Sequence, residues 1–202
     1  MLKAAGRCFQ LDYRFRFLFE MKVPRIIGAR VFLRSPTKRD AAEFIALNRA
    51  SRAFHRGLVS PPITSEQFVD LLNRSNKDSS VCLLICAAAK GGIIGAVNLS
   101  QIFRGGFQSA YLGYYVGKQY AAQGYMTEAL RLTLKYAFNS LKLHRLESNI
   151  QPGNLASIAL VKRAGFHKEG YSRRYLKICG RWRDHERWAI IAEDWKSKNS
   201  GK

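Results

Sequence analysis

A glycine, Gly124, stands directly before a stretch whose apolar residues, from Met126 to Leu141, recur every three or four positions. That spacing predicts a helix packed on a core. The first amides of such a helix lack intrahelical partners, and the helix dipole there favours an anion such as phosphate. A glycine lets a phosphate approach the backbone closely, and Lys118 and Arg131 add positive charge nearby. The pattern indicates phosphate binding, although a glycine before a helix is equally typical of a simple turn.

The elements that must position this turn alternate between strands and helices. Apolar runs and alternating patterns predict strands, whereas stripes of period 3.6 behind capping residues predict helices. The predicted strands cover residues 30–34, 81–88, 93–99, 108–117, 144–150, 166–177 and 185–192. The predicted helices follow Thr37 and Thr64 and cover 124–141 and 154–164. This order indicates one mixed domain, residues 23–202, with a strand, glycine turn, helix and strand at its centre.

The charge of the chain is strongly unbalanced. Among 202 residues, Lys and Arg number 34 against 14 Asp and Glu, which gives a formal net charge of +20. Such a potential attracts RNA, nucleotide phosphates or an acidic membrane face, and it repels polyamines. A basic solubility shell is the alternative interpretation.

The cysteines and the first residues carry further expectations. Four cysteines show no C-x-x-C spacing and no metal pairing with the histidines, so we expect reduced thiols, no metal and a cytoplasmic protein. Cys82 and Cys86 lie in an apolar run and are expected in the core. The chain has no apolar stretch of membrane-spanning length, so no membrane partner is expected. Residues 1–22 are interpreted as an N-terminal extension, either a flexible arm or sequence upstream of a start at Met21.

Three segments in order carry a family resemblance: YLGYYVG at 111–117, QGYMTEAL at 123–130 and the stretch from Asn154 to Phe166. Together they resemble the GNAT family of N-acetyltransferases, and within it the members that acetylate the N-terminal alanine of a ribosomal protein. The resemblance runs from Arg30 to Trp195 and is strongest after Ile93. It implies an α/β fold with a twisted, mostly antiparallel sheet of six to seven strands, about four flanking helices and two splayed strands at a cofactor cleft.

The resemblance also implies the cofactor, acetyl-coenzyme A, and the residues that bind it. The strand ending at Val116 would pair with the pantetheine arm, and the glycine turn would hold the pyrophosphate. The implied cofactor residues are Tyr115, Val116, Ala122, Gln123, Gly124, Tyr125, Met126, Thr127 and Asn154. The chain departs from the family pattern at Ala121, where Gln or Arg is usual, and at Val161, where many members place a tyrosine that protonates the leaving thiolate.

The catalytic and acceptor residues are less well marked. Glu147 and Tyr114, the latter through a water, are candidates for the base, and Ser157 for assisting the thiolate. Surface pairing remains the simpler account of Glu147, and a local backbone bond that of Ser157. Asn98 and Tyr111 are candidates for binding the acceptor, with a turn role and a core role as their alternatives.

The expected function is acetyl transfer to the N-terminal α-amine of a ribosomal protein, at alanine or serine. The basic stretch from Lys162 to Arg187, with Trp182 and other aromatics interleaved, would additionally contact ribosomal RNA or the ribosome. One alternative is a small-amine acetyltransferase with an aminoglycoside-like acceptor, which the positive charge disfavours. Another is a non-enzymatic ribosome-binding protein with a vestigial cofactor site.

Overall fold

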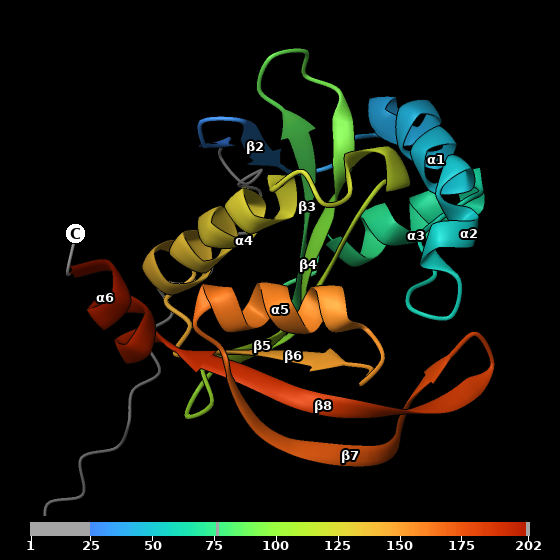
Figure 1. Ribbon diagram of the computed structural model, residues 1–202. Helices are drawn as coiled ribbons and strands as arrows, with labels where there is room; N and C mark the ends of the chain where they lie inside the picture. Colours follow the sequence, from blue (N-terminus) through green and yellow to red (C-terminus); the bar gives the residue numbers. More distant parts are fainter. Residues whose placement is uncertain (1–24, 76, 201–202) are drawn as a thin grey trace, which may run out of the picture.

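The fold is built on one sheet of eight strands. The computed structural model describes residues 25–75 and 77–200, so the predicted extension at 1–22 lies outside the described residues. The strands are β1 (Ile26–Ile27), β2 (Val31–Arg34), β3 (Ser80–Ala87), β4 (Ile93–Phe103), β5 (Ser109–Val116), β6 (Arg145–Ile150), β7 (His167–Ile178) and β8 (Arg181–Ile191). Their spatial order is β1-β2-β3-β4-β5-β6-β8-β7, and every neighbouring pair is antiparallel except β5 and β6 (Figure 1).

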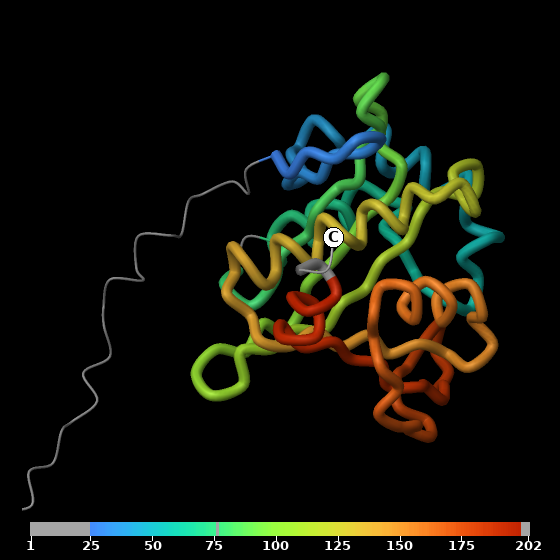
Figure 2. Tube along the Cα trace, turned by 60° about the vertical axis from the view of Figure 1, so that its left-hand side comes forward, coloured from blue at the N-terminus to red at the C-terminus, as the bar shows by residue number. Residues whose placement is uncertain are grey.

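Helices cover both faces of this sheet. They are α1 (Ala41–Ala50), α2 (Arg52–His55), α3 (Ser65–Ser75), α4 (Tyr125–Lys135), α5 (Leu155–Ala164) and α6 (Ala192–Ser200). One core lies between the sheet and α4 and α5, and a second lies between the opposite face and α1 and α3. The trace in Figure 2 shows α4 crossing the sheet on the side away from α1 to α3. Alternation along β3 sends Leu83 to the first core and Cys82 and Cys86 to the second, as a period of two requires.

The predicted strand and helix order is confirmed, with additions at its margins. The sheet has eight strands rather than six or seven because β1 is a two-residue strand, too short to leave a pattern. The predicted helix from 124 to 141 is α4 followed by a turn of π-helix, Tyr136–Ser140. Cys82 and Cys86 are buried free thiols, as expected.

The described residues hold neither a candidate membrane span nor a candidate metal cluster. None of the helices described is long and apolar enough to cross a bilayer. Within the same residues, no group of three or more His, Cys, Asp or Glu side chains could hold a metal ion.

The parallel pair at the centre of the sheet is open at one end. β5 and β6 pair only from Ser109 to Tyr111, opposite Arg145 to Glu147. Beyond that point β5 continues to Val116 and β6 to Ile150 without pairing to each other. The predicted splay is therefore present, and it leaves one edge of β5 without a strand partner.

Candidate active site

The unpaired edge of β5 presents backbone groups to the gap between the strands. Gly117 donates its amide to the carbonyl of Ile94 at 2.8 Å. The backbone N–H and C=O groups of the odd-numbered residues of β5 therefore point towards β4. Alternation turns the N–H and C=O groups of Tyr114 and Val116 towards the open side. An extended ligand can add to such an edge as a further strand.

The exit of β5 is held in place by the junction of α1 and α2. His55 Nε2 donates to the carbonyl of Val116 at 2.9 Å, and Ser51 Oγ accepts from the amide of Lys118 at 3.0 Å. A Cβ at Gly117 would collide with Leu47. Burial lowers the pKa of His55, which keeps the ring neutral near pH 7. The free group of Val116 at the open edge is consequently its amide.

The predicted phosphate turn has the backbone form that anion binding needs. Ala122 and Gly124 both have left-handed backbones, with φ of 59° and 82°. Nothing in the described chain accepts a hydrogen bond from the amides of residues 122–127, whereas the amide of Glu128 already bonds to the carbonyl of Gly124 at 3.3 Å. Consecutive free amides in such a turn form a concave donor set suited to an anion.

Arg30 lies beside this turn, although no sequence pattern predicted it there. Arg30 donates to the carbonyl of Gln123 at 3.0 Å and stacks on the ring of Tyr125, with 4.4 Å from its guanidinium carbon to the ring centroid. Glu128 Oε1 in turn accepts from the amide of Arg30 at 2.9 Å. These contacts join the β1–β2 turn to the start of α4, and they place a positive charge at the phosphate turn.

The start of α5 faces β5 across the gap. Asn154 is the N-cap of α5, and its Oδ1 accepts from the amide of Ser157 at 3.2 Å. Tyr114 donates its hydroxyl weakly to the carbonyl of Ser157 at 3.5 Å. Burial raises the pKa of Tyr114 to about 12, so its hydroxyl is protonated at neutral pH. A hydroxyl in that state is a hydrogen-bond donor and a poor base.

The position where many family members carry an acid is part of the core. Val161 is completely buried in the cluster between the sheet, α4 and α5. Tyr114 is the described hydroxyl that approaches the same helix from β5. The chain therefore lacks the family tyrosine at Val161 on α5 but has a tyrosine, Tyr114, on β5.

Two predicted residues meet where the splay begins. Tyr111 and Glu147 form the last paired positions of β5 and β6. A hydrogen bond with Tyr175 raises the pKa of Tyr111 to about 12. Glu147 Oε1 accepts from Arg145 Nε at 2.9 Å, and Arg145 also binds Glu169. The ion pairing expected as the alternative for Glu147 is present, and its carboxylate still lies at the apex of the cleft.

Gly113 leaves the α1–α3 face of β5 open between Tyr111 and Tyr115. It is exposed, and a Cβ there would meet no atom within 4 Å. A glycine inside a strand often marks the close approach of a ligand. This signal was readable in the sequence, whereas Arg30, Ser51 and His55 carry no local mark.

Asn98 and Tyr115 lie on that same face but deeper under the helices. They line a pocket of about 120 Å³ beneath the loop of residues 59–62. The ring of Tyr115 packs edge-on against His55 at 5.2 Å between centroids, in the second core. Asn98 pairs with Gly113, two positions along β5 from Tyr111, and it lines a different pocket from Tyr111 and Glu147.

The basic stretch forms the ribbon of β7 and β8. Trp182 and Tyr171 are exposed on it, whereas Trp188 is buried. Several of its cations have acidic partners, such as Lys168 with Glu186 at 2.5 Å.

An open strand edge beside a helix that begins with free amides is the architecture of an acyl-coenzyme A cleft. The residues present fit such a ligand, because unpaired backbone N–H donors lie along the β5 edge and at residues 122–127. The family comparison agrees: the model described as "Acetyltransferase (GNAT) domain" matches residues 30–167. The chain belongs to this family and is an N-acetyltransferase with the GNAT fold.

The chain is similar to several named proteins. The chain is 37% identical to "Probable N-acetyltransferase YjcK" of Bacillus subtilis, over 83% of this chain and 97% of that protein. It is 43% identical to the "[Ribosomal protein uS5]-alanine N-acetyltransferase" of Escherichia coli, over 51% of this chain and only 53% of that protein. Among solved structures, Mycobacterium smegmatis RimJ in complex with CoA-disulfide has a TM-score of 0.75 and 27% identity, covering 81% of this chain and 82% of that one.

Proposed function

We propose that the chain transfers the acetyl group of acetyl-coenzyme A to the N-terminal α-amine of a protein, an alanine or serine of a ribosomal protein. The match to the uS5-alanine enzyme, 43% over about half of each chain, is the observation that carries the acceptor class. The likeness to a RimJ bound to a coenzyme A derivative supports the cofactor.

The cofactor would be bound mainly by backbone. The free amides of residues 122–127 would hold the pyrophosphate, with Arg30 adding charge, and the open edge at Tyr114 and Val116 would pair with the pantetheine arm. Asn154 retains its amide nitrogen for that arm, since only its Oδ1 is used in capping. In this arrangement the thioester would point towards Tyr111 and Glu147.

The reaction requires a neutral amine. Its lone pair attacks the thioester carbonyl, a C–N bond forms, the C–S bond breaks, and the amine proton passes to a base while the thiolate gains one. An α-amine with a pKa near 7.7 is roughly one-sixth neutral at pH 7, against about four in ten thousand for lysine. The weak demand for a base suits Glu147, an ion-paired carboxylate, acting directly or through water.

We assign Tyr114 the donor role at the leaving thiolate. Its raised pKa favours the protonated hydroxyl, and its partner at 3.5 Å is weak enough to be exchanged. The amide of Val116 would polarise the acetyl carbonyl. Ser157, whose backbone serves Asn154 and Tyr114, would have a supporting part at the start of α5.

The test compares acceptors that differ only at the amine. Thiol release from acetyl-coenzyme A is measured with an alanine-starting peptide and with the same peptide blocked at its N-terminus, both containing an internal lysine. Release from the free N-terminus alone is expected. Equal release from both peptides would show lysine chemistry, and release only with small amines would replace the proposed acceptor class.

A further inference from the structure

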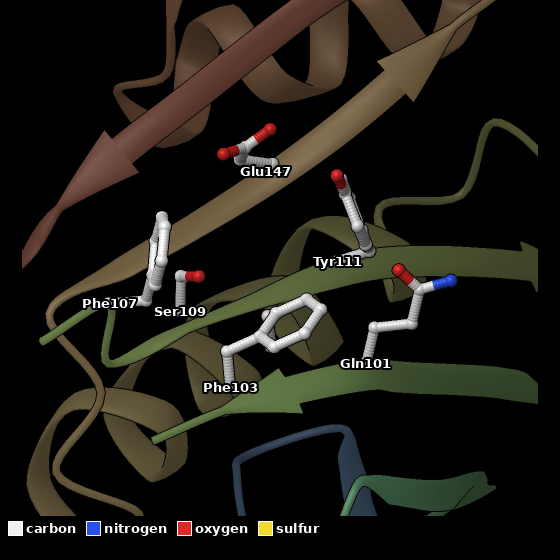
Figure 3. A pocket seen from close by; sticks show the side chains of 7 residues that line it. Gln101, Phe103, Phe107, Ser109, Tyr111 and Glu147 are labelled. Atoms are coloured by element: carbon white, nitrogen blue, oxygen red, sulfur yellow. The ribbon is translucent and has the colours of Figure 1, made fainter. Parts of the chain in front are cut away.

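A second hollow lies beside the apex of the cleft. It has a volume of about 140 Å³ and is lined by Gln101, Phe103, Phe107, Ser109, Ala110, Tyr111 and Glu147. Figure 3 shows these side chains arranged around it, with Glu147 contributed by β6 and the others by β4, β5 and the loop between them. The hollow is separate from the phosphate turn and from the pocket that contains Asn98.

Two aromatic side chains in its wall are exposed without an evident structural reason. Phe107 is 76% exposed and Phe103 is 49% exposed, and their ring centroids are 6.2 Å apart. Exposed large apolar groups that cluster around a cavity commonly mark a binding surface. The loop that follows Phe103 and carries Phe107 is anchored, because Arg104 donates to the carbonyl of Leu141 at 2.5 Å.

The pocket is continuous with the proposed reaction centre. Tyr111 and Glu147 belong to its wall, and they are also the last paired positions before β5 and β6 diverge. Ser109 lies two positions before Tyr111 on the same face of β5, a distance of about 7 Å along a strand. An extended acceptor peptide covers that distance in about two residues.

We propose that this pocket, the Phe103–Phe107 pocket, binds an apolar side chain at the second or third residue of the acceptor polypeptide. The inference rests on the proposed function and deepens it. Aromatic rings and a half-open hollow of this size suit a leucine-sized or similar side chain. The pocket would make the enzyme selective for the side chains next to the acetylated residue.

The charges of the wall argue against an anionic occupant. Glu147 is the one charged residue among the seven that line the pocket, and Arg104 is engaged with Leu141. In a chain of net charge +20, the absence of cations from this lining disfavours a phosphate or a nucleic-acid backbone there.

The experiment measures peptide binding in the absence of turnover. Three short alanine-starting peptides, with leucine at position two, leucine at position three, or glycine at both, are titrated calorimetrically into the coenzyme A-saturated protein. We expect one leucine peptide to bind about tenfold more tightly than the glycine peptide, as for a modest apolar contact in a pocket. Phe107→Ala should remove this preference, whereas Val69→Ala, which truncates an exposed side chain on α3, should retain it.

Each outcome is decisive. Equal affinity for the three peptides, no measurable binding of any, or a leucine preference that survives Phe107→Ala overturns the inference. A dimer that Phe107→Ala dissociates in sedimentation would assign the pocket to a second copy of the chain and would overturn it too. Acetyl transfer to all three peptides is measured in parallel, because its absence from every one of them refutes the proposed acceptor class independently of the pocket.

Discussion

The two sides of the cleft are built from different materials. On the cofactor side, most of the groups available to a ligand belong to the main chain, at Tyr114, Val116 and residues 122–127, with Arg30 and Asn154 as the side chains beside them. On the acceptor side, the available groups are side chains, among them Tyr111, Glu147 and Phe107. A backbone site depends on where strands and turns run, and a side-chain site depends on which residues occupy them.

This difference explains why the backbone conformation is the more constrained on the cofactor side. The exit of β5 is fixed by His55, Ser51 and Gly117. On the acceptor side, Gly113 and Phe107 are exposed. Substitutions should therefore separate cofactor binding from acceptor selection.

The largest expected effect comes from breaking the backbone site at its turn. Gly124→Val adds a β-branched side chain at φ 82° beside the free amides and should weaken coenzyme A binding about a hundredfold, through backbone strain and blocked access. The affinity is measured by calorimetry. Gly91→Val is the matched control, because its φ of 73° imposes similar strain in the β3–β4 hairpin, where no atom lies within 4 Å of the new Cβ. Equal loss of coenzyme A affinity in both variants would contradict the phosphate role of this turn.

Gly113→Val should produce the opposite pattern. The new side chain meets no protein atom within 4 Å, so the fold should tolerate it, but it occupies the open face where the acceptor would approach. We expect kcat/KM for the acceptor peptide to fall about tenfold or more, with the coenzyme A affinity nearly unchanged, as for steric exclusion from a pocket. A matching fall in coenzyme A affinity would show that this face also serves the cofactor.

The strand, turn and helix of the cofactor side were predicted correctly from the sequence, for a physical reason. A strand, a glycine turn and an amphipathic helix are local patterns, so residues 111–138 reveal them directly. The hydrogen bond from His55 to the Val116 carbonyl, which acts as a clamp on the end of β5, could not be predicted in this way. The two residues are 61 positions apart and meet only after folding. Phe107 and Glu147 are likewise brought together by the sheet. Asn98, like Tyr111 a candidate for binding the acceptor, lines another pocket.

His55 offers a smaller and more specific perturbation of the cofactor side. His55→Leu removes the donor to the Val116 carbonyl and leaves that carbonyl without its present partner, which should raise the KM for acetyl-coenzyme A about tenfold. kcat should change less, because His55 positions the strand and does not contact the reacting atoms. His55→Gln, which keeps an N–H donor, should recover part of the loss. An unchanged KM in His55→Leu would mean that β5 holds its position without the clamp.

The smallest expected effect concerns stability in mild acid. Burial lowers the pKa of His55 below its ordinary value of 6.5, and only the hydrogen bond to Val116 opposes this shift. Between the lowered pKa of His55 in the folded protein and its ordinary pKa in the unfolded chain, the unfolded chain therefore binds more protons than the folded one. The free energy of unfolding should consequently decrease as the pH falls below 6.5.

His185 contributes in the same window, because burial lowers its pKa too. Thermal unfolding between pH 7 and pH 5 should thus be compared in the wild-type chain and in His55→Gln, which retains the donor without titrating. The variant should lose less stability on acidification than the wild type, with the residual slope due to His185 and, near pH 5, to carboxylates of lowered pKa such as Glu169 and Glu186. Parallel pH dependence in the two proteins would show that the pKa of His55 is the same in the folded and the unfolded chain, and that the support of the cofactor side does not respond to pH.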